Sequence, residues 1–333
     1  MKVDWRRKMS ALKEFDALQK ELKIYGWSGL FHYTDFTNFV NIMKRGALLS
    51  KHRAQKENLL RWEMNKREAT VAMGVDLSEY TRFYYAPKTT MLYESEGVKA
   101  EEKGTAHMPV PVLLVFRKEL VMNEDALFFD GDAENRNSFC YDNLAEARYK
   151  MDWQGVFSRF EQDPDDFYSA RVRCAELLLP DEVALQGNLV AVVFRTMADL
   201  KNAQNIVGFN PLFMIDKTMF NNFKGWNNAG IGGNRRKNVY NYIMDYDIGI
   251  EGNTLEMHYS FASDELSRYA HEFKITYASG TTQVDDSDYD GNAVEWDLEE
   301  DIIRDEPFEV SYSINGHRLI YWYSDDWTGP RGV

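Results

Sequence analysis

The chain has 333 residues, of which 44% are hydrophobic and 14% aromatic, so it holds enough apolar material for the cores of two ordinary domains. Its formal net charge of −14 argues against simple nucleic-acid binding, because phosphate contacts need Lys and Arg. Two cysteines, Cys140 and Cys174, are too few for a disulfide framework or a thiolate metal site. The first residues contain no apolar run typical of a signal peptide or membrane helix, so we expect a cytoplasmic protein without membrane contact.

The charge is distributed unevenly along the chain. Residues 1–220 hold 30 basic and 32 acidic side chains, whereas residues 221–333 hold 9 and 21. Within residues 1–100 the balance is basic, with 18 Lys and Arg against 12 Asp and Glu, which suits a phosphate-facing surface. We therefore expect nucleic-acid contacts in the N-terminal part and a protein contact in the acidic C-terminal part.

The N-terminal elements follow from apolar spacing. Residues 8–24 form an amphipathic pattern that predicts a helix, with apolar positions at Met9, Leu12, Phe15, Leu18 and Leu22. A short strand at 29–34 precedes a second helix, which Gly46 is expected to end. Residues 50–75 are basic and helical in pattern, and six apolar runs of strand length recur between 83 and 215. This succession predicts an α+β fold.

The last third of the sequence differs in character. A stretch rich in Gly and Asn near 221–238 indicates a domain boundary, and alternating apolar and polar residues from 239 onward predict antiparallel strands. Asn315-Gly316 is a strong signal for a type I′ hairpin, and the acidic stretch 284–306 indicates a solvated loop or edge. We expect one domain over 1–220, with a helical extension at 1–28, and an acidic β-rich accessory domain over 221–333.

Three segments carry the candidate chemistry. The first is His32-Tyr33-Thr34 at the end of a strand, followed by Asn38 and Gly46 along the next helix. A histidine and a hydroxyl beside a helix start can bind the ribose and amide of a nicotinamide nucleotide. Taken alone, this pattern is more often a core histidine and a helix cap.

The second segment is the aromatic run 80–93, in which Tyr84 offers a ring face to a nicotinamide while Phe83 and Tyr85 alternate to the other side. The third contains the acidic turn 163–166 and then Cys174-Ala175-Glu176, where Glu176 interrupts an otherwise apolar run. A charge among apolar neighbours needs compensation if it is buried, which distinguishes Glu176 from an ordinary solvent-facing strand residue.

Together, the three segments resemble the DarT family of DNA ADP-ribosyltransferase toxins over residues 31 to roughly 200, which implies an ADP-ribosyltransferase-like mixed sheet core with helices. The second segment is similar to the family pattern Tyr-x-x-Phe-Tyr-Phe-x-Pro-x-x-Pro-Met-Leu, with Thr90 in place of the second proline. The resemblance maps the family's catalytic glutamate onto Glu176. A carboxylate there stabilises the positive charge that develops on the ribose as the bond to nicotinamide breaks.

The resemblance also implies NAD as co-substrate, without a metal. The catalytic residues it implies are Glu176, His32, Tyr84 and an arginine, which is Arg67 in preference to Arg61. The NAD-binding residues it implies are His32, Tyr33, Thr34, Asn38, Gly46, Arg61, Arg67, Phe83, Tyr84 and Tyr93.

Residues 128–135 resemble the family's stretch leading into the substrate loop. Other members carry a histidine near Asp132, so the identity of the catalytic base in this chain stays open. The loop residues mix cations and aromatics, as expected for contacts with an unstacked base; they are Asp132, Arg136, Asn137, Phe139, Tyr141, Arg148, Tyr149 and Trp153. The alternative is a packed surface helix.

The resulting prediction is an NAD-dependent ADP-ribosyltransferase that modifies a base of single-stranded DNA or RNA. The resemblance implies a toxin of a toxin-antitoxin or phage-defence system, restrained by an antitoxin that inhibits the site or hydrolyses the mark. One alternative is a metal-dependent nuclease that uses Asp130, Asp132, Glu134 and the acids at 163–166. Another is a non-catalytic protein-interaction module.

Overall fold

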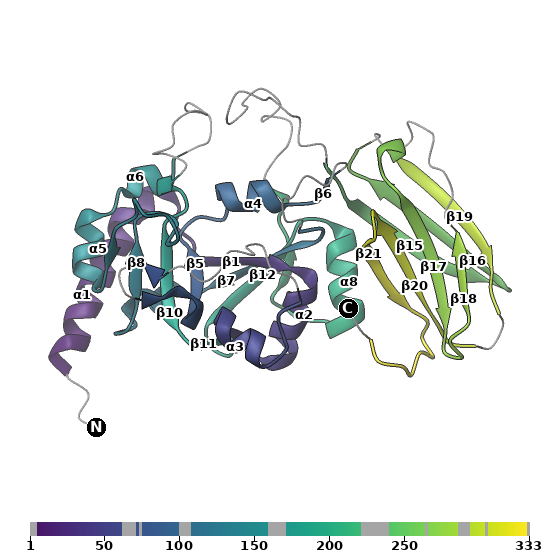
Figure 1. Cartoon of the computed structure of the whole chain (residues 1–333), viewed down its shortest axis with the longest axis horizontal. Coiled ribbons are helices and arrows are strands. Elements are labelled where there is room, and N and C mark those ends of the chain that lie inside the picture. The colour runs from purple at the N-terminus through teal and green to yellow at the C-terminus, as the bar shows by residue number, and fades with distance from the viewer. Residues whose placement is uncertain are drawn as a thin grey trace.

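The computed structural model describes residues 5–61, 71–72, 75–99, 108–158, 171–220, 240–263, 266–285, 294–303 and 306–331. The N-terminal two thirds form a mixed sheet with helices around it, and the C-terminal third forms two antiparallel sheets that lie face to face (Figure 1). The predicted α+β class with a C-terminal β-rich module is therefore confirmed. In the described part of the chain, no helix is both long and apolar enough to cross a membrane.

The large sheet has the strand order β13-β12-β7-β1-β5-β10-β8-β9. Neighbouring strands are antiparallel, except that β12 and β13 run parallel. The strands are β1 (Leu30–Asp35), β5 (Tyr80–Tyr84), β7 (Pro111–Phe116), β8 (Leu127–Phe129), β9 (Cys140–Tyr141), β10 (Glu176–Pro180), β12 (Leu189–Phe194) and β13 (Phe213–Ile215).

The middle of this sheet is forked. In the described strands, β1 and β5 are in register at one pair, Phe31 with Tyr84. Beyond that pair, β1 remains paired with β7 as far as Asp35, and β5 remains paired with β10 as far as Tyr80. The sheet therefore opens into two half-sheets, β13-β12-β7-β1 and β5-β10-β8-β9, and a pocket lies at the opening.

Helices surround the sheet. They are α1 (Trp5–Leu22), α2 (Phe36–Arg45), α3 (Lys51–Lys56), α4 (Thr90–Ser95), α5 (Leu144–Lys150), α6 (Trp153–Val156) and α8 (Met197–Val207), with 3-10 turns η1 (Lys23–Tyr25), η2 (Leu77–Glu79), η3 (Lys118–Met122), η4 (Lys217–Met219) and η6 (Leu266–Arg268). The predicted helix at 8–24 is confirmed as α1, which buries Phe15, Leu18 and Leu22 but leaves Met9 and Leu12 exposed.

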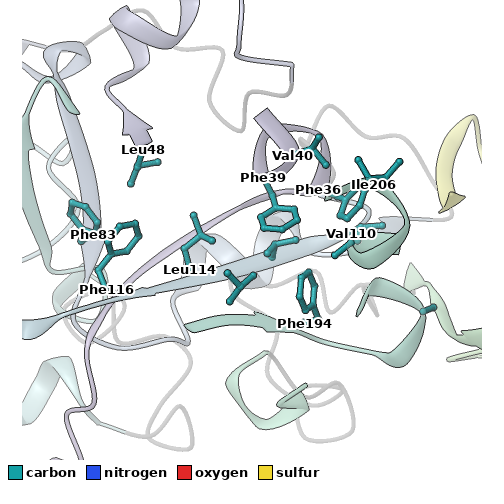
Figure 2. Close-up of a cluster of buried hydrophobic side chains, with 14 of the residues drawn as sticks. Phe36, Phe39, Val40, Leu48, Phe83, Val110, Leu114, Phe116, Phe194 and Ile206 are labelled. Carbon is teal, nitrogen blue, oxygen red and sulfur yellow. The ribbon is translucent and has the colours of Figure 1, made fainter. Parts of the chain in front are cut away.

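Helix α2 has the ends that its sequence predicts. The Asp35 carboxylate accepts a hydrogen bond from the Thr37 amide at the N-terminus. Gly46, with φ of 72°, donates its N–H to the Ile42 carbonyl at the C-terminus. Between these caps, Phe36, Phe39 and Val40 face the sheet and pack with β7 and β12 side chains in the main core (Figure 2).

The helical prediction for residues 50–75 is wrong at its end. Residues 51–56 form α3, and residues 62–70 lie outside the described part. At the end of the segment, β3 (Val71–Ala72) pairs antiparallel with β4 (Val75–Asp76). The β-branched valines favour strands and the intervening sequence contains Gly74, which explains why the helical pattern does not continue.

The C-terminal module is a two-layer β-structure. One sheet has the order β15-β16-β19 and the other β18-β17-β20-β21. Tyr259 and Tyr312 meet between the layers with ring centres 5.1 Å apart. The strands are β15 (Ile243–Glu251), β16 (Thr254–Phe261), β17 (His271–Tyr277), β18 (Thr282–Asp285), β19 (Glu295–Asp301), β20 (Phe308–Ile314) and β21 (His317–Tyr323).

Two local predictions for this module are confirmed. Asn315 and Gly316 have φ of 50° and 74°, which are the positive values that a type I′ turn requires between β20 and β21. The acidic stretch contributes β19, which is an edge strand of its sheet. Two further pairs complete the fold, β2 (Ala47–Leu49) with β11 (Glu182–Ala184) and β6 (Val98–Lys99) with β14 (Tyr240–Asn241).

Helix α8 joins the two halves of the protein, as Figure 1 shows. Asn202 on α8 is fully buried and donates to the Leu319 carbonyl at 2.7 Å. Its side-chain oxygen accepts from the Tyr321 amide at 2.9 Å and the Tyr246 hydroxyl at 3.1 Å. The asparagine therefore supplies hydrogen bonds that the outer edge of β21 would otherwise lack. The division at residue 220 stays a prediction, but the two sides of it share one apolar core.

We predict that Asn202→Ala lowers the free energy of unfolding by about 3 kcal/mol, because a buried amide and a buried carbonyl on β21 lose their partners. Gln204→Ala on the same helix, at a half-buried position, is the matched control and should cost well under half as much. Urea unfolding of both variants measures the difference. Equal losses would show that the Asn202 contacts contribute nothing particular.

Candidate active site

A pocket opens where the two half-sheets separate. On one side it is lined by β1 and α2, including His32, Thr34 and Asn38, and on the other by Arg82 of β5 and its neighbours. Glu134, from the loop after β8, also lines it. Segments distant in sequence thus meet at one cavity because β1 and β5 no longer pair there.

His32 bridges the fork. Its Nδ1 donates to the Arg82 carbonyl oxygen at 2.9 Å, so a side chain replaces the backbone pairing that β1 and β5 have given up. Burial lowers the pKa of His32, which keeps the imidazole neutral at pH 7. With the proton on Nδ1, Nε2 is a hydrogen-bond acceptor for a ligand in the pocket.

The α2 side of the pocket is held by amides. The buried Asn38 accepts a hydrogen bond from the Arg61 amide at 2.8 Å, and Asn41 donates to the Leu59 carbonyl at 2.7 Å. These bonds fix the chain that follows α3 against α2. Arg61 itself is exposed, and Arg67 lies outside the described residues.

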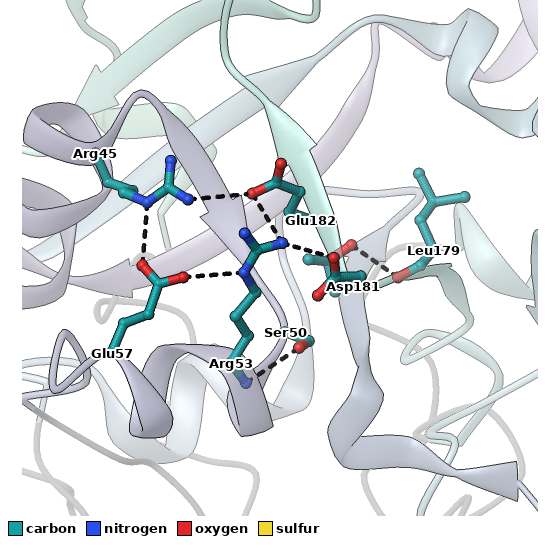
Figure 3. Close-up of polar contacts among 8 residues, drawn as sticks. Arg45, Ser50, Arg53, Glu57, Leu179, Asp181 and Glu182 are labelled. Carbon is teal, nitrogen blue, oxygen red and sulfur yellow. Dashed lines mark hydrogen bonds and ion pairs between the residues drawn. The ribbon is translucent and has the colours of Figure 1, made fainter.

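Arginine and acidic side chains brace the same wall (Figure 3). Arg53 of α3 contacts Glu57 at 3.0 Å, Asp181 at 2.6 Å and Glu182 at 3.1 Å. Arg45 of α2, which lines the pocket, contacts Glu57 at 3.1 Å and Glu182 at 3.5 Å. The network links α2 and α3, which line this wall of the pocket, with β11.

A stacked tyrosine pair lies on the other face of β1 and β5. The rings of Tyr33 and Tyr84 are 5.1 Å apart and almost parallel, at 6°. The Tyr33 hydroxyl donates to the Tyr84 hydroxyl at 3.2 Å, and Thr89 donates to Tyr33 at 3.4 Å. The Tyr84 hydroxyl in turn hydrogen-bonds the Glu176 carboxylate. Three hydroxyls therefore lead to one carboxylate.

Glu176 is the first residue of β10 and is 1% exposed. The Ala133 amide donates to its Oε2 at 2.8 Å, and Arg82 Nη1 lies 3.9 Å from the same oxygen. Burial raises the pKa of Glu176 to about 7, against the opposing effects of Arg82, Ala133 and Tyr84. A carboxylate so placed is near its midpoint at neutral pH, which is typical of functional sites.

Arg82 links Glu176 to the pocket, and sequence reasoning missed it. Its guanidinium lies 3.0 Å from Glu134 and 3.9 Å from Glu176. A signal was present, because Arg82 stands two residues before Tyr84 and therefore lies on the same face of the strand. Glu134 was predicted as part of the stretch 128–135 that resembles the family and as a metal ligand of a nuclease, and not as the partner of an arginine.

The loop after β8 is tightly closed. A Cβ at Gly131 would lie 2.7 Å from side-chain atoms of Arg171 and Ser138, so a glycine is needed there. Asp130 contacts Arg171 at 2.6 Å, and the Asp132 carboxylate accepts from the Glu134 amide at 2.9 Å. These contacts hold the loop against Glu176.

The predicted substrate-loop residues separate into two groups. Arg136, Asn137 and Phe139 are exposed, with Phe139 64% exposed. Tyr141 packs at the margin of the main core and Tyr149 is 76% exposed against the Arg148 guanidinium.

The second group has structural contacts. Arg148 forms ion pairs with Glu14, at 3.0 Å, and with Glu21, which docks α5 on α1. Trp153 is buried and packs edge-on against Tyr85, while its ring nitrogen donates to the Arg148 carbonyl at 3.0 Å. These two side chains hold helices together and do not lie in the pocket.

Two predicted NAD-binding positions, Phe83 and Gly46, do not line the pocket, and a third, Tyr93, has a side chain that the structure does not describe. Phe83 is in the main core, where its ring meets Phe116 at 5.0 Å, on the sheet face opposite Tyr84. Gly46 ends α2 and is not among the residues that line the pocket. Tyr93 belongs to α4, and its side chain lies outside the described part.

The arrangement gives no support to a nuclease. Among the described residues, no group of three or more His, Cys, Asp or Glu side chains could hold a metal ion. Asp130 and Glu134 are each paired with an arginine, and the acids at 163–166 lie outside the described residues.

We predict that Glu176→Gln stabilises the protein above pH 7, because it removes a charge that burial makes unfavourable. The pKa of Glu176 is higher in the folded state, so its penalty is absent below pH 4.5, grows as the pH rises to about 7 and is constant above. The gain at pH 8 should be up to about 3 kcal/mol.

Unfolding at pH 8, 6 and 5 measures this gain, with Glu124→Gln at an exposed position as the control. A difference between wild type and Glu176→Gln that does not change with pH would contradict the assignment of the buried charge.

Comparison with known proteins identifies one family. The model of a family described as ssDNA thymidine ADP-ribosyltransferase, DarT, matches residues 31–221. Similar solved structures include DarT of Thermus sp. 2.9 in complex with NAD+, at 17% identity and a TM-score of 0.46 over 59% of this chain and 98% of that one. The same protein in complex with ADP-ribosylated ssDNA is 18% identical, with a TM-score of 0.45 over 59% of this chain and 97% of that one. DarTG of Thermosipho africanus in complex with ADP-ribose is also 18% identical, with a TM-score of 0.45 over 58% of this chain and 50% of that one. Curated protein sequences give no match.

Proposed function

The chain belongs to the DarT family and is an NAD-dependent ADP-ribosyltransferase, and from this premise we propose that it transfers ADP-ribose to thymidine in single-stranded DNA at the fork between β1 and β5. One observation carries the proposal. A buried carboxylate, Glu176, is held by an amide, a hydroxyl and the guanidinium of Arg82, and Arg82 in turn lines the pocket.

NAD+ would bind in the pocket between the half-sheets. His32, Thr34 and Asn38 line it with hydrogen-bonding groups suited to a nucleotide's ribose and amide. The stacked Tyr33 and Tyr84 form an aromatic platform beside it, and one face of Tyr84 is already covered by Tyr33. Arg61 or Arg67 would meet the diphosphate, because the Arg61 amide is fixed by Asn38 at the pocket.

Glu176 would act on the nicotinamide ribose. As the bond from C1′ to nicotinamide breaks, its electron pair goes to the pyridine nitrogen and positive charge develops on the ribose. An ionised carboxylate next to C1′ stabilises that charge more than it stabilises the ground state. The Ala133 amide and the Tyr84 hydroxyl hold the carboxylate in position.

The acceptor would reach the site as an unstacked base. Bases inside a duplex are shielded, so a single strand is the accessible substrate. The exposed Arg136, Asn137 and Phe139 offer a cation, an amide and a ring at the margin of the closed loop. The family description favours DNA over RNA as the acceptor.

The wider role follows from the family. We infer a toxin of a toxin-antitoxin or phage-defence system, acting in the cytoplasm, where NAD and single-stranded DNA are both available. Its antitoxin would inhibit the site or remove the ADP-ribose. The acidic module over 221–333 would be an accessory domain that contacts protein.

We predict label transfer from radiolabelled NAD+ to a thymidine-containing DNA oligonucleotide, in the presence of EDTA. Glu176→Gln should lower the rate at least about 100-fold, since it removes the charge that the transition state needs. The same oligonucleotide without thymidine, and an RNA of equal length, test the acceptor. Transfer to RNA alone, or a requirement for metal, would contradict the proposed function.

We also predict a pH profile with one acidic limb. The ionised form of Glu176 is the active form, so kcat/KM should fall about tenfold per pH unit below the pKa of about 7 and level off above it. Arg82 lowers this pKa, so Arg82→Gln should move the limb to higher pH. A limb that stays in place in Arg82→Gln would show that another group titrates.

A further inference from the structure

We propose that Glu134 is the general base that takes the proton from the acceptor nitrogen, and that Arg82 positions it beside Glu176. The inference rests on the proposed function and assigns to a second carboxylate the half of the reaction that Glu176 does not perform. Three contacts carry it: Glu134 with Arg82, Arg82 with Glu176, and the Ala133 amide with Glu176.

The reaction requires two carboxylate functions: one group must accept the imide proton, and one must remain an anion beside the ribose. When a thymine ring nitrogen bonds to C1′, its N–H proton must leave, because the imide is a weak acid that is protonated at neutral pH. Glu176 is needed as an anion against the developing ribose charge. If Glu176 took the proton as well, it would lose that charge at the moment of transfer.

Glu134 occupies the position that such a base needs. It lines the pocket, and its side chain is 15% exposed, whereas Glu176 is 1% exposed. Its neighbour Ala133 donates to Glu176. The Arg82 guanidinium lies 3.0 Å from Glu134 and 3.9 Å from Glu176, so both carboxylates lie around one guanidinium. The Asp132 carboxylate instead accepts a hydrogen bond from the Glu134 amide at 2.9 Å, which shapes the turn that carries Glu134.

Arg82 and Glu134 also match the edge of the base. An imide presents a carbonyl oxygen beside an N–H, which need a donor and an acceptor side by side. The guanidinium of Arg82 and the carboxylate of Glu134, 3.0 Å apart, supply that pair. A guanidinium donating to the carbonyl would stabilise the negative charge that grows on the imide as the proton leaves.

The step balances without a further reactant. The bond from C1′ to nicotinamide breaks with its electron pair going to the pyridine nitrogen, which neutralises the pyridinium. The bond from C1′ to the thymine nitrogen forms from the nitrogen's electron pair. The N–H proton goes to the Glu134 carboxylate and from there to solvent.

The test separates transfer to the base from attack by water. We expect Glu134→Gln to lower transfer to thymidine at least about 100-fold and to lower NAD+ hydrolysis far less, because water attack does not require the imide proton to be removed. Glu176→Gln should lower both rates together. Glu134→Asp, which keeps a carboxylate, should fall between wild type and Glu134→Gln, and Glu124→Gln at an exposed position should match wild type.

A second readout uses the acidity of the acceptor. An oligonucleotide with 5-fluoro-2′-deoxyuridine in place of thymidine has a more acidic N–H, so it needs a base less, and the Glu134→Gln defect should shrink several-fold with it. Equal defects with both acceptors, or equal losses of transfer and hydrolysis, would overturn the assignment of Glu134. Absence of transfer by the wild-type chain would instead overturn the proposed function, and the inference with it.

Discussion

The separation of β1 from β5 is the constraint on which the site depends. An unbroken sheet would satisfy its backbone groups along the full length of both strands and leave no opening between them. Here each strand keeps one continuous partner, β7 or β10, and the two half-sheets meet at the pair of Phe31 and Tyr84. The hydrogen bond from His32 to the Arg82 carbonyl closes the base of the fork, so one of the residues suited to bind a ligand also maintains the opening.

A second constraint is electrostatic. Burying Glu176 is unfavourable by itself, and the fold limits that cost with partners from two segments, β5 and the loop after β8. Those partners do not neutralise it fully, which leaves its pKa near 7 and its charge available at neutral pH. The loop from Asp130 to Glu134 carries the amide that holds this carboxylate, and close contacts at Gly131 and a hydrogen bond within the turn fix its conformation.

Local sequence signals predicted most of the fold, and their success has a physical basis. The caps of α2, the turn at Asn315 and the burial of Glu176 are each encoded within a few residues. The fork was not predictable, because it depends on which strands pair. Arg82 was missed for a related reason, because its partners Glu134 and Glu176 are distant from it in sequence. Its spacing from Tyr84 shows that both side chains share a face only when the strand and its position in the sheet are known. The loop assignment of Arg148 overlooked Glu14, its partner on α1.

The contact between α8 and β21 contributes to stability and also connects the C-terminal module to the part of the chain that forms the pocket. The family model ends at residue 221, but α8 lies inside that range with its asparagines committed to a strand beyond it. Phe36, the first residue of α2, likewise has its ring 5.0 Å from that of Tyr321. The remaining turns of α2 line the pocket. The acidic module therefore packs directly against the helix that lines the pocket, and a truncation near residue 221 would remove a support of the pocket wall.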